Sequence, residues 1–461
     1  MRALTSLRFT RPWVLCLLTA VLGTATARAE SSVTPEDTTA RYQMTYNWQR
    51  HPGFATQGAD GPNSLSSSAE RMYTFSATAH WGMRPWAGGE LYFNPELIQG
   101  VPFSHNLVGL GGFTNGEITR AGGSEPKLYR QRLFVRQTWG RGGGTEEIDA
   151  DFNQLASRVD KNRWVLTAGN FSVLDVFDDN AYAKDPRTQF MNWSHWTYGA
   201  YDYAADSRGY GWGAALAWHQ DNWVLRFARM TGPKEPNGLP VDFNLARHYG
   251  DQFEVERAHQ IGEQPGKLRV LLWRNRARLA SFDDARQWWL AQPLAVRQSI
   301  TGPDALVATR TSDKTKYGLG VNVEQSLRED IGWFMRAMTT DGRTETYAFT
   351  EIDRSFSTGL LVQGKRWARA QDSVGLAWGH NALSAERLSG GGRHLVLPGR
   401  WPPELPPRDR AGGLLQPADR AGQLAHGQPP AHPEPGLQRA AWPGSGVRLS
   451  FSRRVLSLLC K

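Results

Sequence analysis

The chain has 461 residues, a formal net charge of +9, 19 Trp and 48 Gly, and its mean hydropathy is −0.51. This hydropathy excludes a bundle of transmembrane helices, although the aromatic content is high for a soluble protein. The two cysteines are Cys16 and Cys460, so the sequence predicts no disulfide, no zinc or other metal site and no thiol chemistry, and nothing in it indicates a cofactor.

The first predicted element is a secretory signal peptide over residues 1–29. A positive region precedes the apolar run Pro12–Gly23, and Ala27-Arg28-Ala29 supplies a small-x-small cleavage site. The rest of the chain is therefore expected to be exported. For an exported protein the net positive charge does not indicate a nucleic-acid partner.

Residues 30–390 are expected to form one domain of β-strands, because apolar and polar side chains strictly alternate along successive segments. The strongest example is the hairpin Tyr210–Met230, whose strands flank a turn at Asp221-Asn222. The apolar positions of the predicted strands include, in chain order, Tyr42, Met44, Tyr46, Trp48; Tyr73, Phe75, Trp81; Trp212, Leu216, Trp218; Trp223, Leu225, Phe227; Tyr317, Leu319, Val321; Trp333, Met335; and Val374, Leu376, Trp378.

Aromatic side chains near the strand ends favour a membrane boundary, where amphipathic rings are preferred. The second face of the hairpin Tyr210–Met230 carries mostly Gly and Ala, which favours a wall that lines a space. The sequence thus predicts an all-β fold, a transmembrane antiparallel β-barrel. Spanning lipid requires closure of such a barrel, because open edges leave backbone groups unpaired in hydrocarbon. An exported soluble β-sandwich that binds or hydrolyses carbohydrates is the alternative.

Longer polar stretches separate the predicted strands and are expected to be extracellular loops. Loops of this length in a barrel often fold inward and narrow the pore, where selectivity is set. The stretches are residues 50–70, 141–162, 175–209, 233–264 and 281–313.

Arginines recur on the polar face of the predicted strands. On a lipid-facing position each would cost roughly 2–4 kcal/mol at mid-depth, so they are expected to line an aqueous lumen. In the segment 130–139 a regular strand places three arginines and one phenylalanine on one face. The candidate residues on such inward faces are Arg130, Arg132, Phe134, Arg136, Arg226 and Arg336.

The planar fork of arginine donates to two oxygens at once, which suits hydroxylated solutes, and Phe134 offers a flat surface for a sugar ring. Two other interpretations remain. The arginines pair with acids in the lumen and stiffen the wall, or the pore carries organic acids.

Acidic residues give no sign of catalysis or of metal binding. Four aspartates between Asp175 and Asp185 lack the ligand spacing of a calcium loop, so a solvated loop, or a loop folded against the arginines, is favoured. Glu90 and Glu117 are a conceivable carboxylate pair for glycoside hydrolysis, but no spacing supports it. Glu117 stays a candidate channel residue, and the sequence predicts no enzyme.

Long composite motifs cover six parts of the chain: Phe93–Gly123, Tyr129–Trp139, Leu166–Trp196, Tyr201–Trp218, Pro265–Phe282 and the strands from Lys316 to Leu388. These motifs resemble the carbohydrate-selective outer-membrane porins of the OprB family. The resemblance implies a monomeric sixteen-stranded barrel in outer-membrane lipid, inserted by the barrel assembly machinery. It also implies that the barrel admits glucose and related sugars by diffusion past arginines and aromatics.

The composition changes abruptly after Leu388. Residues 391–461 hold 11 of the 26 prolines and no Asn, Ile or Tyr, and proline removes donors that a central strand needs. The sequence predicts a disordered tail there. We expect a frameshift near Leu388–Arg393, because an alternate frame of GC-rich DNA yields Pro, Arg, Gly and Ala. Such a product lacks several closing strands and is expected to assemble poorly.

Overall fold

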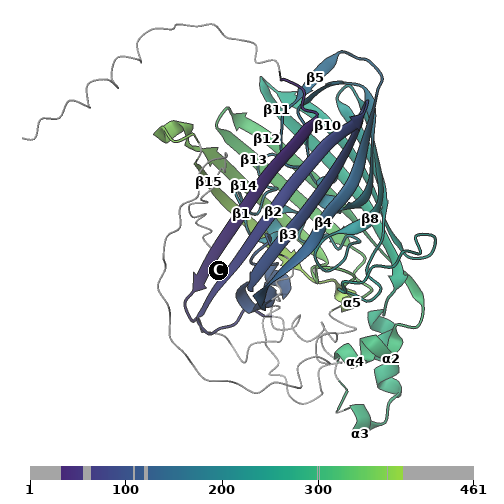
Figure 1. The fold of residues 1–461 in the computed structure, drawn as a ribbon. Helices are drawn as coiled ribbons and strands as arrows, with labels where there is room; N and C mark the ends of the chain where they lie inside the picture. Colours follow the sequence, from purple (N-terminus) through teal and green to yellow (C-terminus); the bar gives the residue numbers. More distant parts are fainter. Residues whose placement is uncertain are drawn as a thin grey trace, which may run out of the picture.

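The computed structural model describes residues 33–55, 64–106, 109–118, 123–297, 299–300, 302–370 and 372–387. In this part of the chain, 13 strands form one antiparallel sheet that curves like the wall of a barrel (Figure 1). Each strand pairs with the next one along the sheet. The strands are β1 (Thr38–His51), β2 (Glu70–Trp86), β3 (Gly89–Val101), β4 (Gly123–Gly140), β7 (Arg163–Phe171), β8 (Gly211–Gln220), β9 (Trp223–Met230), β10 (Tyr249–Ile261), β11 (Gln264–Arg278), β12 (Asp313–Arg328), β13 (Ile331–Thr340), β14 (Arg354–Gln363) and β15 (Ser373–Ala382).

The predicted all-β class and antiparallel wall are confirmed, but the sheet is not closed. Within the described residues β1 and β15 are its two edges, and 13 strands are fewer than the sixteen that the family resemblance implies. The predicted signal peptide, the site of the expected frameshift and the tail over residues 391–461 lie outside the described residues.

The remaining elements are short and lie in the connections between strands. No described helix is both long and apolar enough to cross a membrane. The elements are the hairpin β5 (Thr145–Ile148) and β6 (Ser157–Asp160), the helices α1 (Trp193–Trp196), α2 (Phe282–Ala291), α3 (Leu294–Arg297), α4 (Gly302–Thr309) and α5 (Ala385–Arg387), and the 3-10 turns η1 (Phe103–Asn106), η2 (Gly109–Gly111), η3 (Val173–Asp175) and η4 (Gly364–Trp367).

The alternation read from the sequence sets the two faces of the sheet. Aromatic and aliphatic side chains such as Tyr46, Trp48, Leu216 and Trp378 are exposed on the outer face. Their neighbours along each strand, among them Ala215, point inward and are buried. A lipid-facing band of apolar side chains with a second, inward face is the pattern of a membrane barrel.

The connections at the two ends of the sheet differ in length. At one end they are residues 52–69, 102–122, 172–210, 231–248, 279–312 and 341–353, whereas most connections at the other end are tight turns. In outer-membrane barrels short turns face the periplasm and long loops face the outside. We call the first end the loop end and the second end the turn end.

One predicted extracellular loop is wrong, and the predicted loop 233–264 is correct only up to residue 248. Residues 141–162 connect β4 to β7 at the turn end, because β4 runs away from the loop end, and they form the β5–β6 hairpin. The stretch 233–264 contains β10, which pairs with β9 and β11. Polar and acidic residues on the inward face of β10 gave this strand the composition of a loop.

Residues 172–210, which we call the inner loop, fold against the inward face of the sheet. Their buried aromatic side chains Trp193, Tyr198, Tyr201 and Tyr203 form the centre of the main hydrophobic cluster. A soluble sandwich would fill its interior with a second stacked sheet. In the described residues a loop occupies this place instead, so the structure does not support the sandwich alternative.

Candidate functional site

The inner loop begins with the turn η3, which an ion pair attaches to β4 of the sheet. Ser172 caps η3, and its backbone N–H donates to the Asp175 carboxylate. Arg132 on β4 donates to both oxygens of Asp175, with each N–O distance 2.7 Å. This bidentate geometry is the strongest form of an arginine–carboxylate pair, so it holds the first turn of the loop against β4.

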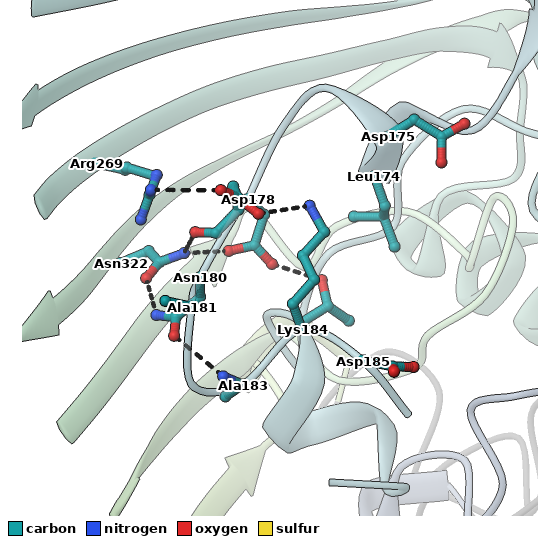
Figure 2. Close-up of polar contacts among 12 residues, drawn as sticks. Leu174, Asp175, Asp178, Asn180, Ala181, Ala183, Lys184, Asp185, Arg269 and Asn322 are labelled. Carbon is teal, nitrogen blue, oxygen red and sulfur yellow. Dashed lines mark hydrogen bonds and ion pairs between the residues drawn. The ribbon is translucent and has the colours of Figure 1, made fainter. Parts of the chain in front are cut away.

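The middle of the inner loop is held by the opposite part of the wall. The Asp178 carboxylate accepts from Arg336 on β13 at 2.8 Å and from Asn322 on β12 at 2.6 Å. Its backbone N–H donates to Glu254 on β10 at 2.9 Å, and Thr197 donates to its other oxygen. Figure 2 shows Asp178 and Asn180 beside Asn322 in this network. The loop therefore spans from β4 to β10–β13.

Asp179 differs from Asp178, because 54% of its side chain remains exposed. Lys184 lies 3.3 Å and Arg269 3.8 Å from its carboxylate oxygens, and Figure 2 labels Lys184 and Arg269. The charge of Lys184, aided by that of Arg269, holds the pKa of Asp179 well below its ordinary range. Asp179 is therefore an ionised carboxylate, and the neighbouring cations are Lys184 and Arg269.

Arg269 on β11 supports this site from the wall. Its guanidinium is fully buried and lies 2.8 Å from Glu256 and 3.0 Å from Glu324. Arg269 and Lys184 are not among the residues predicted from the sequence. The signal for Arg269 was present, since the apolar residues on either side of it alternate to the outer face of β11.

Among the predicted site residues, Arg132 and Arg136 lie on the inward face and stay partly exposed. Arg136 lies 3.4 Å from Glu90 and packs over the rings of Tyr92 and Phe134. Phe134 also points inward, but it is only 3% exposed and stacks on Tyr92. The expected sugar-binding surface at Phe134 is therefore wrong, because its ring is covered.

Arg130 does not share the face of Arg132, contrary to the expectation from regular alternation. Arg130 pairs with Pro95, Arg132 pairs with the residue before Pro95, and Gln131 is the extra residue of a β-bulge. Proline lacks the N–H that a regular ladder needs and is found at bulges. The bulge turns Gln131 inward and leaves Arg130 exposed, with its guanidinium over the ring of Trp212 on the outer face.

The other three candidates are buried in ion pairs. The Arg336 side chain is almost fully buried and forms an ion pair with Asp178. Arg226 lies 2.9 Å from Glu254 and 3.0 Å from Glu256, so it belongs to the same network of the wall. These contacts favour the interpretation in which arginines pair with acids and hold the structure.

Glu117 is also buried, in the loop between β3 and β4, where it accepts from Ser76 and lies 3.1 Å from Arg187. Burial raises the pKa of Glu117, while the charge of Arg187 opposes that rise. Glu90 has different partners, Arg136 and Arg84. In the described residues no group of three or more His, Cys, Asp or Glu side chains has the arrangement of a metal site.

One family model matches most of the chain, and one solved structure shares its fold. The model of the family "Carbohydrate-selective porin, OprB family" matches residues 63–410. The high-pH structure of Pseudomonas putida OprB has a TM-score of 0.52 at 12% identity and covers 76% of each chain, which shows a shared fold.

Two further solved structures resemble the chain only weakly. Pseudomonas aeruginosa OccK2, in complex with glucuronate, matches with a TM-score of 0.33, 8% identity and coverage of 75% of this chain and 81% of its own. Acinetobacter baumannii OccAB1 matches with a TM-score of 0.34, 8% identity and coverage of 75% and 79%. Neither score carries an argument. No curated protein matches the chain.

Proposed function

Because this chain belongs to the OprB family of carbohydrate-selective porins, and is thus an outer-membrane porin rather than an enzyme, we propose that it admits glucose-like sugars by passive diffusion. The solute passes along the line where the inner loop meets the inward face of the sheet. The observation that carries this proposal is the exposed carboxylate of Asp179 beside Lys184, together with the partly exposed inward-facing cations Arg132 on β4 and Lys267 on β11.

The chemistry of these side chains suits sugars. A sugar hydroxyl both donates and accepts hydrogen bonds. It can therefore replace its bonds to water by donating to a carboxylate and accepting from an ammonium or guanidinium group. Asp175 and Asp179 also offset part of the positive charge. A pore for organic acids would gain from uncompensated cations, so these two carboxylates favour neutral solutes over anions.

The test is liposome swelling with the purified protein, its expected frameshift corrected, and three solutes that differ in size or charge: glucose, a disaccharide and gluconate. We expect glucose to enter faster than gluconate, which has a similar size but carries a charge, and the disaccharide to enter more slowly than glucose. Equal rates for glucose and gluconate would remove the claim of sugar selectivity and favour the organic-acid pore.

Localisation and assembly have their own test. The proposed route is export with a signal peptide, insertion by the barrel assembly machinery and function as a monomer. In fractionated cells we expect the protein with its expected frameshift corrected to be extracted from the outer membrane only with detergent, and to show gel migration that changes on heating. Recovery in the soluble periplasm would contradict the proposal and revive a soluble carbohydrate-binding protein.

A further inference from the structure

The outer face of β9–β12 changes character sharply near the loop end. One row across the four strands consists of Phe227, Phe253, Leu272 and Leu319, which pair in register and are all exposed. These four side chains face lipid. The next outward-facing row, two residues closer to the loop end, is charged on β9, β10 and β11 and carries Tyr317 on β12.

The charged row places one carboxylate between two arginines. Asp251 on β10 accepts from Arg229 on β9 at 2.8 and 3.0 Å, and from Arg274 on β11 at 2.8 and 3.0 Å. The two guanidiniums also lie over the ring of Tyr249, at 3.9 and 5.4 Å from its centroid. Their planes are thus held in place by a shared acid and a shared ring.

A second carboxylate repeats this arrangement at the start of β12. Asp313 lies 2.9 Å from Arg247 and 3.6 Å from Arg276, and it also contacts His248, whose other ring nitrogen lies 2.6 Å from Asp242. Arg278 stands opposite Asp313 in the register. We call Arg229, Arg247, Arg274, Arg276 and Arg278 the arginine patch.

The charges of the arginine patch are not balanced by its acids. Five guanidiniums stand against three carboxylates, those of Asp242, Asp251 and Asp313. The exposed side-chain fractions of Arg229, Arg247, Arg274 and Arg276 are 39 to 55%, whereas Asp251 and Asp313 expose only 10% and 12%. The buried carboxylates therefore hold the guanidiniums in place, and the exposed surface of the patch consists mainly of positively charged hydrogen-bond donors.

We propose that the arginine patch binds the phosphate groups of a phosphorylated lipid in the outer leaflet of the membrane. The patch adjoins the lipid-facing row on the outside of the wall, so it lies where head groups begin. Guanidinium forks match phosphate geometry in a bidentate way, and basic pockets at a membrane surface recognise anionic head groups. A solute in the channel cannot reach the patch, because these side chains point away from the inner loop.

The test uses the full-length protein purified in an uncharged detergent, with thermal unfolding and direct binding as readouts. The probes are bis-phosphorylated lipid A, the same lipid after removal of both phosphates, and inorganic phosphate. We expect bis-phosphorylated lipid A to raise the unfolding temperature and to bind at least tenfold more tightly than the dephosphorylated lipid. Inorganic phosphate at millimolar concentration should give no comparable shift.

Variants locate the binding. The triple variant Arg229→Gln, Arg274→Gln, Arg276→Gln should lose at least tenfold in affinity for bis-phosphorylated lipid A. Arg274→Lys keeps the charge but not the fork, and should lose less. The matched control is Arg366→Gln, which removes a similarly exposed arginine, paired with Asp330, at the turn end. This control should bind as the unmodified protein does.

Three results would overturn the proposal. These are equal binding of the two lipids, unchanged binding by a folded triple variant, or an equal response to inorganic phosphate, which would indicate a simple anion site. The first and third comparisons use the unmodified protein, so they decide the question even if the triple variant does not fold. None of these readouts depends on sugar permeation.

Discussion

Asp178 and Arg336 form a buried ion pair between the inner loop and β13, and both side chains are almost fully covered. Removing one partner leaves an uncompensated buried charge, which typically costs about 3–5 kcal/mol. We therefore expect Arg336→Ala to release the middle of the inner loop from the wall. In planar bilayers its single-channel conductance should rise, and liposome swelling should discriminate less between glucose and a disaccharide.

Arg366→Ala is the control for this substitution, because it removes an exposed pair at the turn end. Exposed pairs contribute about 0–1 kcal/mol, so conductance should stay the same. An Arg336→Ala protein that folds, but keeps the conductance and the solute discrimination of the unmodified channel, would show that the inner loop does not limit passage.

His195 in α1 is a single residue that makes the packing of the inner loop depend on pH. Burial, together with the charge of Arg336, lowers the pKa of His195 from 6.5 to about 4. A released inner loop would take up a proton near pH 6.5, whereas the packed loop resists it. Above about pH 6.5 His195 is neutral in both states, so it does not disfavour packing of the loop. As the pH falls from 6.5 towards 4, protonation favours the released loop, and the free energy that holds the loop packed decreases.

We predict that channel conductance rises on acidification through this range, as the inner loop loosens. Conductance recorded from pH 7 to pH 4 checks it, with His195→Gln as the comparison. The variant removes this proton-binding group, while carboxylates that titrate in the same range remain. An identical pH profile in both proteins would assign the effect to the carboxylates instead.

At the scale of an element, the bulge in β4 separates two arginines that lie two positions apart. Arg132 faces inward to Asp175, and Arg130 lies over Trp212 on the outer face. We expect Arg132→Ala to change the glucose swelling rate several-fold, whereas Arg130→Ala should leave it unchanged. If both substitutions change the rate equally, β4 does not carry this bulge in the membrane.

The sequence predicted the strands well where a single rule governed them. Alternation located β1, β2, β8, β9, β12, β13 and β15, because one face meets lipid and the other does not. Alternation gave the wrong face for Arg130, because it assumes that each residue of a strand has one partner and Gln131 is an extra residue in a bulge. Pro95 on the neighbouring strand is the sequence feature that indicates a bulge there.

The site was less predictable, because its partners are distant along the chain. The sequence left two options for the aspartates of the inner loop, a solvated loop or a loop folded against arginines, and in the structure Asp175 and Asp178 contact arginines. It did not indicate which arginine each would meet. Asp178 and Arg336 lie 158 residues apart, and only the curvature of the whole sheet brings them together.

At the scale of the whole molecule, β1 and β15 are edges that lipid does not tolerate. Within the described residues each pairs on one side only, and each carries exposed apolar side chains on its outer face, such as Tyr46 and Leu376. Unpaired backbone groups in hydrocarbon cost several kcal/mol each. A stable membrane form therefore needs further strands between these two edges.

The expected frameshift near Leu388–Arg393 leads to a test of this requirement. Sequencing across that position should reveal a shifted frame that encodes alternating strands and ends in an aromatic residue. The frame-corrected protein should show heat-modifiable gel migration, and the present chain should show little of it. If neither shifted frame encodes alternating strands, the frameshift hypothesis fails.

The span of the inner loop from β4 to β13 also has a consequence in time. Its first contact joins Asp175 to Arg132 over 43 residues, whereas its contacts with Glu254, Asn322 and Arg336 span 76, 144 and 158 residues. Contacts this remote in sequence form slowly. Docking of the loop is therefore expected as a late folding step, so that an assembly intermediate in which β13 has not yet joined the sheet holds Asp178 without Arg336.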